Sequence, residues 1–315
     1  MIAIAMMMAL AAASGDEVTI PGPQGPLAGT YQAPASGDGN GPVVVIIPGS
    51  GPADRDGNSP MGLKAQPYKL LAEALAGRGI ASVRIDKRGM FASRAAADAN
   101  AATIEAYAAD ARAWAKFAAK RAGAKCAWLV GHSEGGLVAL EAAQDSSGIC
   151  GVILVSAPGR PLGVIMREQL RANPANAPIL PQALAMLDGI DAGRTTDPAT
   201  LPAPLPMIFP EAVQRYMIAE FKFDPAKLAA TARVPVVIVQ GDNDIQVSLD
   251  DAKLLAAAQP KARLVVLPGV NHVLKVVPMG DRAANAASYA DPARPIAPGV
   301  VDAVATAVAG KGQRT

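Results

Sequence analysis

The sequence predicts an α/β protein built on a mostly parallel, doubly wound sheet with one helical insertion. Short runs rich in Val and Ile alternate with alanine-rich segments of helical periodicity, which is the pattern of crossover connections between parallel strands. These runs are apolar at almost every position, as expected for strands that helices cover on both faces. One long segment, 159–232, interrupts the alternation and carries many prolines.

The chain opens with two short strands, "DEVTI" and "GPLAGTYQAP", which "PGPQ" joins in a hairpin-like turn. Buried strands are expected next, in the order "PVVVIIPGSG", "IASVRIDKRG", "KCAWLVGHS", "GICGVILVSAPG", "VPVVIVQGDND" and "ARLVVLPGVNH". The helices between and after them are expected over 68–76, 103–121, in "EGGLVALEAA", and over 248–258 and 298–309. Gly77 and Gly79 are stop signals for the first of these helices.

The segment 159–232 is predicted to be a helical cap. It holds helical pieces such as "PEAVQRYMIAE" but no β-branched strand, and a stretch this long without a strand indicates an insertion. Ligands of parallel sheets bind beyond the carboxyl ends of the strands, so the insertion should overhang the site. The body of the protein would then comprise 16–158 and 233–312. Apolar cap residues such as Met166 and Phe221 either pack the cap onto the body or line an apolar pocket.

The first residues, "MIAIAMMMALAAASGDE", are apolar from Ile2 to Ala13 and end in small residues. This run is too short to span a membrane. It resembles the hydrophobic region of a secretory signal with an Ala-x-Ala exit, although no Lys or Arg precedes it. A signal peptide over 1–13 and export to the periplasm or medium are therefore expected. A disordered or misassigned start, with a cytoplasmic protein, is the alternative.

Composition excludes several classes of function. The 315 residues carry a net charge of only +2, which argues against a nucleic acid partner or an anionic membrane surface. The two cysteines and two histidines have no tight metal-ligand spacing, so no metal site and no cofactor are expected. Nothing in the sequence indicates an oligomeric state.

A candidate nucleophile lies between a predicted strand and a predicted helix. Gly131-His132-Ser133-Glu134-Gly135 matches the pattern G-x-S-x-G. In such a sharp turn the serine has a strained backbone, and a Cβ atom at either glycine would clash. Glycine-rich turns are common, so the pentapeptide alone is a modest signal. The strand before it and the helix after it favour Ser133 as a nucleophile.

A serine nucleophile needs a base, and the base needs an orienting acid. His132 adjoins Ser133 and should point away from its Oγ, as neighbours in an extended chain do. The candidate base is therefore His272, the other histidine, which follows a predicted strand. Asp242 and Asp244 both follow the strand before that one, so either is a candidate acid.

The sequence resembles the α/β-hydrolase fold superfamily and, within it, bacterial serine esterases with a GSGPxDRDGN signature. The chain reads "PGSGPADRDGN" over 48–58 and "DKRGMFAS" over 86–93, where the family has DxRGxGxS. It departs from that pattern at Phe91, where the family usually has glycine. The resemblance extends from the first strand to His272, and its motifs are specific when taken together.

This resemblance implies the remaining site residues. The family's acid lies in G-x-x-D-x-x-V, which Gly241, Asp244 and Val247 match, so Asp244 becomes the expected acid and Asp242 a turn residue. Two backbone N–H groups should hold the oxyanion, one at Glu134 after the nucleophile and one at Ser50. The alternative for "PGSGP" is a merely flexible turn.

The expected function is hydrolysis of a small-molecule carboxylic ester through an acyl-enzyme on Ser133. A peptidase or thioesterase with the same triad is the main alternative, because fold does not fix function. A lyase or haloperoxidase-like use of the fold and a non-catalytic binding protein are further alternatives.

Two charged clusters follow neighbouring strands, at 54–56 and 86–88. Mutual salt bridges that hold the two loops in place are expected, with direct substrate contact as the alternative. Glu134 is expected to pair with one of the arginines in these clusters.

Cys126 and Cys150 each lie six residues before the end of a predicted strand. If these strands are parallel neighbours, the cysteines lie side by side at about the spacing of a disulfide. A bridge is expected in an oxidising compartment, and two buried free thiols are the alternative.

Overall fold

The computed structural model describes residues 15–36, 40–98 and 101–310, so the predicted signal segment 1–13 lies outside the described residues. Eight strands form one sheet in the order β1-β2-β4-β3-β5-β6-β7-β8. β2 pairs antiparallel with both β1 and β4, and all the other pairings are parallel. The strands are β1 (Asp16–Pro21), β2 (Pro26–Gln32), β3 (Val43–Ile47), β4 (Ala81–Ile85), β5 (Ala127–His132), β6 (Ile149–Val155), β7 (Val236–Gly241) and β8 (Arg263–Leu267). The predicted mostly parallel sheet is confirmed.

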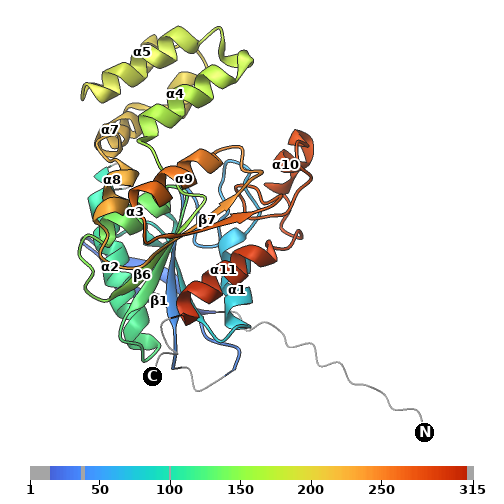
Figure 1. Ribbon diagram of the computed structural model, residues 1–315. Helices are drawn as coiled ribbons and strands as arrows, with labels where there is room; N and C mark the ends of the chain where they lie inside the picture. Colours follow the sequence, from blue (N-terminus) through green and yellow to red (C-terminus); the bar gives the residue numbers. More distant parts are fainter. Residues whose placement is uncertain (1–14, 37–39, 99–100, 311–315) are drawn as a thin grey trace.

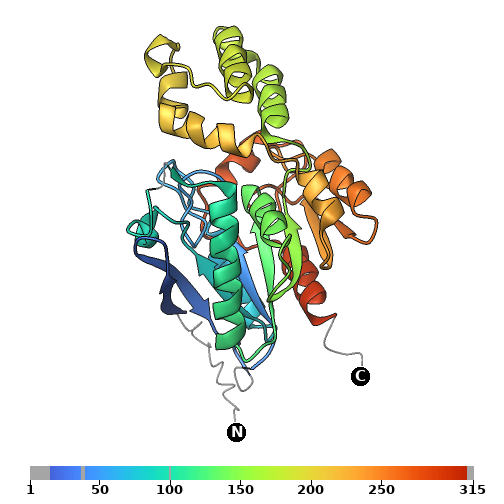
Figure 2. The same cartoon turned by 90° about the vertical axis from the view of Figure 1, so that its left-hand side faces the viewer.

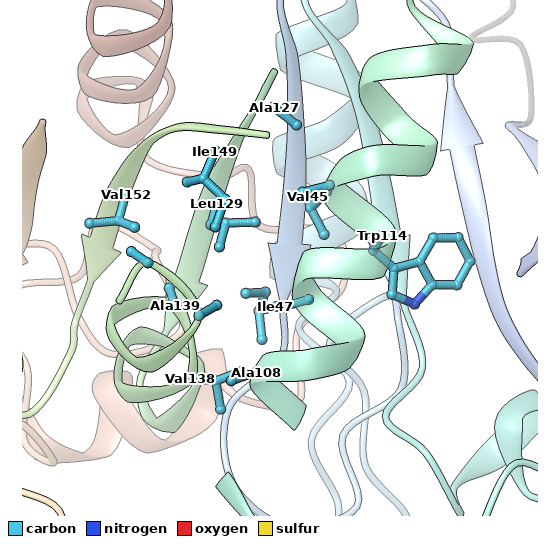
Figure 3. Close-up of a cluster of buried hydrophobic side chains, with 14 of the residues drawn as sticks. Val45, Ile47, Ala108, Trp114, Ala127, Leu129, Val138, Ala139, Ile149 and Val152 are labelled. Carbon is cyan, nitrogen blue, oxygen red and sulfur yellow. The ribbon is translucent and has the colours of Figure 1, made fainter. Parts of the chain in front are cut away.

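Helices cover both faces of the sheet, because alternate residues of its buried strands point to opposite sides. Val43, Val45 and Ile47 of β3 pack into one apolar core with helices α2, α3, α8 and α9, whereas Val44 and Ile46 pack into the other with α1 and α11. Figure 3 shows the first core, where Val45, Ile47 and Leu129 of the sheet meet side chains of α2 and α3. The helices are α1 (Pro67–Ala76), α2 (Ile104–Arg121), α3 (Glu134–Ala142), α8 (Pro225–Thr231), α9 (Leu249–Ala258), α10 (Arg282–Ser288) and α11 (Pro298–Ala309).

Local sequence explains where two of these helices begin. The Thr103 side chain accepts a hydrogen bond from the backbone N–H of Ala106 and caps α2. Ser248 and Asp251 form a reciprocal capping box at the start of α9. The helices were predicted to begin at Thr103 and Ser248. Both residues are instead caps that satisfy otherwise unpaired N–H groups, so each helix begins one residue later.

The segment 159–232 contains helices and no strand. Its elements are α4 (Leu162–Ala172), η3 (Pro174–Asn176), α5 (Leu180–Asp191), η4 (Pro198–Thr200), α6 (Leu205–Ile208), α7 (Glu211–Glu220) and α8. The elements over 162–220, here called the inserted helices, share an apolar cluster of their own and lie above one edge of the sheet (Figures 1 and 2). α8 differs, since its Ala229 belongs to the body's core and it packs on α3 and α9.

Two further details differ from or extend the expectations. β8 was expected to be a buried strand, but its residues are partly exposed. It is the last strand of the sheet and therefore has a neighbouring strand on one side only. Cys126 and Cys150, which β5 and β6 bring together, have Cα atoms 5.3 Å apart and are joined by a disulfide.

Candidate active site

Ser133 lies at a sharp turn between β5 and α3. Its φ of 53° and ψ of −126° are values that a side-chain-bearing residue rarely adopts. A Cβ atom added to Gly131 would lie 2.1 Å from Gly135 O, and one added to Gly135 would lie 2.3 Å from Ile47 O. Strand and helix therefore approach closely enough to require both glycines, and the turn holds Ser133 at the carboxyl end of β5.

His272 and Asp244 form a hydrogen-bonded pair. His272 Nδ1 lies 2.8 Å from Asp244 Oδ2, and the Asp244 side chain is fully buried. Asp244 Oδ1 accepts from the backbone N–H groups of Gln246 and Val247. Burial opposes ionisation of Asp244, but the adjacent imidazole and these hydrogen bonds outweigh it and lower the pKa of the carboxyl. An ionised Asp244 accepts a hydrogen bond from Nδ1–H of His272, which leaves Nε2 unprotonated and able to act as a base.

Asp242, the other candidate acid, makes a different contact. Its Oδ1 accepts a hydrogen bond of 2.7 Å from the backbone N–H of Gly269, in the loop after β8. This contact ties the loops after β7 and β8 together. Asp242 is thus a turn residue in the structure.

His132 connects the loops around the site. Its Nε2 lies 2.8 Å from the backbone oxygen of His272, and its Nδ1 lies 2.9 Å from Tyr68 Oη. A carbonyl only accepts, so Nε2 carries the proton and Nδ1 accepts from the tyrosine hydroxyl. Burial and the nearby His272 lower the pKa of His132 to about 3, so its ring stays neutral. Tyr68 Oη in turn accepts from the backbone N–H of Gly49.

Ser133 and His272 come to the same edge of the sheet. The ring of His132, the residue before Ser133, lies 4.8 Å from the His272 ring between centroids. Among the hydrogen bonds of the described residues, none joins Ser133 Oγ to His272. Proton transfer between them therefore requires a closer approach than this arrangement shows, and catalytic hydrogen bonds are often long in ligand-free enzymes.

The loop after β3 lies against the nucleophile. A Cβ atom added to Gly49 would lie 3.1 Å from Ser133 Cβ, so the loop passes close to the nucleophile and a side chain here would crowd it. Among the hydrogen bonds of the described residues, neither the Ser50 nor the Glu134 backbone N–H has a protein acceptor. Both predicted oxyanion donors are thus available, one on each side of Ser133.

Lys87 lies between the residues that carry these two N–H groups and binds next to both. Its Nζ donates to the Gly49 carbonyl at 2.7 Å and to Glu134 Oε1 at 3.2 Å, and both charged side chains are buried. The carbonyl of Gly49 and the N–H of Ser50 belong to one trans peptide group, so they point in opposite directions. By holding the carbonyl, Lys87 sets the direction of the Ser50 N–H. The expectation that Glu134 pairs with an arginine is wrong, because Arg55 and Arg88 pair with Asp86 and Asp110, and Lys87 pairs with Glu134 instead.

The charged clusters at 54–56 and 86–88 are joined by the expected kind of salt bridge between Arg55 and Asp86, whereas Asp56 and Arg88 pair with residues outside the two clusters. Arg55 donates through Nε and Nη2 to Asp86 Oδ2, at 3.1 and 2.9 Å. Arg84 pairs with Asp56, and Arg88 pairs with Asp110 on α2. Phe91, in the second loop, has a φ of 46°, so this position keeps the left-handed backbone that favours glycine in the family pattern.

A cavity of about 390 Å³ lies between the body and helices α4 and α7, beside the two predicted oxyanion donors. Ser50, Lys87 and Glu134 line it from the body. Met166 is the one cavity-lining residue among the apolar residues that the sequence suggested for a pocket. Others of that set pack within the inserted helices, as Met186 and Phe209 do, whereas Met207 and Ile208 are exposed.

Among residues 15–36, 40–98 and 101–310, no group of three or more His, Cys, Asp or Glu side chains could hold a metal ion. Within the same ranges, the structure has no helix of the length and apolarity that a membrane span requires.

Esterases are among the known proteins to which the chain is similar. Over 246 residues the chain is 26% identical to Esterase EstD of Thermotoga maritima, an alignment that covers 76% of this chain and 56% of that protein. The chain thus spans little more than half of that relative's length.

Among solved structures, Est1E of Butyrivibrio proteoclasticus is similar, with 19% identity, a TM-score of 0.55, and coverage of 88% of this chain and 96% of that one. A thermophilic esterase of Thermogutta terrifontis has 20% identity and a TM-score of 0.52, with coverage of 82% and 92%. At such identities these likenesses establish the fold.

A model of the alpha/beta hydrolase family matches residues 44–288, which include Ser133, Asp244 and His272. This match covers most of the chain, and the sheet order and the turn at Ser133 agree with it. The chain belongs to the alpha/beta hydrolase family.

Proposed function

We propose that the protein is a serine hydrolase that cleaves carboxylic esters through a Ser-His-Asp triad. The observation on which this rests is the buried His272–Asp244 pair at the sheet edge where the strained Ser133 lies. The esterase names among its relatives support an ester as substrate. The narrower resemblance to esterases with the GSGPxDRDGN signature stays a prediction.

In the proposed mechanism, His272 Nε2 takes the proton from Ser133 Oγ, which attacks the ester carbonyl. The N–H groups of Ser50 and Glu134 hold the oxyanion of the tetrahedral intermediate. His272 then protonates the leaving alcohol, and afterwards it activates the water that releases the acid from Ser133. Asp244 keeps the imidazole in the correct tautomer and stabilises its charged form.

A fluorophosphonate probe tests the nucleophile without knowledge of the substrate. The wild type should be labelled at Ser133, and the Ser133→Ala variant should not. Equal labelling of both proteins would refute the assignment. Comparing p-nitrophenyl esters with aminoacyl-nitroanilides and thioesters separates an esterase from a peptidase or a thioesterase with the same triad.

We also propose that the protein works in an oxidising compartment outside the cytoplasm. The disulfide between Cys126 and Cys150 supports this proposal, because such bonds rarely persist in reducing cytosol. Mass analysis after alkylation of protein isolated without reductant should find no free thiol. Two alkylated cysteines in that sample would contradict it.

A further inference from the structure

A second set of polar side chains lines the cavity beside the oxyanion donors. Glu134 comes from the start of α3, and Tyr216 and Glu220 come from α7 of the inserted helices. These three residues are here called the polar cluster. The rest of the lining is largely apolar, with Leu162 and Met166 among its members.

The polar cluster is incompletely satisfied by the protein. Glu134 Oε1 pairs with Lys87, but its Oε2 is buried and lacks a hydrogen-bond partner among the described residues. Tyr216 Oη is likewise buried without a hydrogen bond of normal geometry to the described residues, although it lies close enough to the Glu134 carboxylate to interact with it. Glu220 is only 4% exposed and lines the same cavity. Buried polar groups are normally paired, so unpaired ones around a cavity indicate a ligand that pairs them.

The protonation of the cluster shows which ligand chemistry fits. Burial raises the pKa of Glu220 well above its ordinary value, and the Glu134 carboxylate adds to this effect while Lys87 opposes it. Burial and the same carboxylate raise the pKa of Tyr216. Glu220 and Tyr216 therefore hold their protons at neutral pH and can donate, whereas Glu134 Oε2 can only accept.

The balance of charge disfavours an ionic ligand. One carboxylate, on Glu134, and one ammonium, on Lys87, are paired in the cavity wall. An anion would meet Glu134, and a cation would meet Lys87, whose Nζ already lies 5.3 Å from the centre of the Tyr107 ring. A neutral hydroxyl group donates to Glu134 Oε2 and, through its two lone pairs, accepts from both Tyr216 and Glu220, so it satisfies both kinds of partner.

We propose that Glu134, Tyr216 and Glu220 form a subsite that binds a hydroxyl group of the ester substrate. This inference rests on the proposed function and narrows its substrates to esters that carry a hydroxyl group away from the scissile bond. Ser50 and Glu134 line the same cavity, which places the subsite next to the proposed oxyanion site. The inserted helices contribute two of its three residues and thus determine specificity.

Matched pairs of esters test the subsite and show on which side of the ester bond the hydroxyl is bound. Methyl 6-hydroxyhexanoate is compared with methyl hexanoate, and 6-hydroxyhexyl acetate with hexyl acetate, together with the five- and eight-carbon homologues. In at least one pair the wild type should favour the hydroxylated ester by about tenfold in kcat/KM. Tyr216→Phe and Glu220→Leu should each reduce this ratio by roughly fivefold or more, because each removes one donor to the hydroxyl.

The ratio, rather than the absolute rate, separates binding from a structural effect. Glu211→Gln changes an exposed residue of the same helix and should leave the ratio unaltered. Equal kcat/KM within every pair, or a preference that persists in both variants, would overturn the subsite even if Ser133 is labelled by the fluorophosphonate. Failure of that label together with no ester turnover would instead refute the proposed function, and this inference with it.

Discussion

Lys87 provides the sharpest test of how this site is assembled. Its ammonium holds the Gly49 carbonyl at 2.7 Å, and the Ser50 N–H lies on the opposite side of the same peptide group. Lys87→Met keeps the length of the side chain but removes this hydrogen bond and the ion pair with Glu134. The freed peptide group can rotate, and its N–H then no longer points steadily at the oxyanion.

The expected fall in kcat of Lys87→Met depends on which restraints on the Gly49–Ser50 backbone the variant keeps. Complete loss of one oxyanion donor lowers kcat by about 100- to 1,000-fold. Here the Gly49 N–H, which belongs to the preceding peptide group, keeps its hydrogen bond to Tyr68 Oη at 3.1 Å and so restrains the backbone on one side of the freed peptide group. We therefore expect kcat to fall by roughly 10- to 100-fold. KM should change by less than about threefold, because the oxyanion forms only in the transition state.

Pre-steady-state acylation with a p-nitrophenyl ester measures this directly. The variant also leaves the buried Glu134 carboxylate unpaired, at a cost of about 3 kcal/mol or more in stability. Arg88→Met is the matched control, since it breaks the neighbouring ion pair with Asp110 without touching the Gly49 loop. A folded Lys87→Met protein that acylates at the wild-type rate would refute the reasoning, as would an equal loss in the control.

Two further predictions concern stability, and a third concerns the turn at Ser133. Replacing Cys126 and Cys150 by Ala should lower the free energy of unfolding by about 3 kcal/mol, measured by urea titration without reductant, because the bridge closes a loop with a sequence separation of 24. The folded-state pKa of His132 is lowered from 6.5 to about 3, so the unfolded chain binds the extra proton as pH falls below 6.5. His132 should accordingly lower the free energy of unfolding by about 2 kcal/mol between pH 7 and pH 5. The decrease over this interval should therefore be about 2 kcal/mol smaller in His132→Asn than in the wild type, and equal decreases in the two proteins would contradict this prediction. Gly135→Ala should abolish fluorophosphonate labelling, since its Cβ would lie 2.3 Å from Ile47 O, whereas Gly77→Ala, with 3.4 Å to its nearest atom, should be labelled normally.

Local sequence patterns anticipated the elements of the body well. Apolar runs and capping residues such as Thr103 and Ser248 act over a few neighbouring positions, so they could be recognised without the fold. The turn at Ser133 and the loop positions of Asp244 and His272 followed from the same kind of local pattern, supplemented by family resemblance for the choice of Asp244. Edge exposure of β8 could not be recognised, because it depends on the order of the strands in space.

The partners within the site were not predictable in the same way. Tyr68 and His132 are 64 residues apart and meet because α1 packs on the sheet face that carries His132. Lys87 reaches Glu134 across 47 residues because β4, β3 and β5 are neighbours in the sheet. The sequence suggested an arginine for Glu134 since charge alone does not show which carboxylate each basic side chain pairs with.

The sequence by itself determined a parallel α/β sheet, a strained serine between strand and helix, and an acid and a base on loops after later strands. These features depend on hydrophobic periodicity and on residue types with special backbone requirements. Both can be recognised within a short stretch of neighbouring residues. Only the tertiary structure decided that Lys87 holds the oxyanion loop, that His132 and Tyr68 connect this loop to His272, and that α7 brings Tyr216 and Glu220 to the cavity. Such contacts join residues far apart in the chain, and the packing of complete elements selects them.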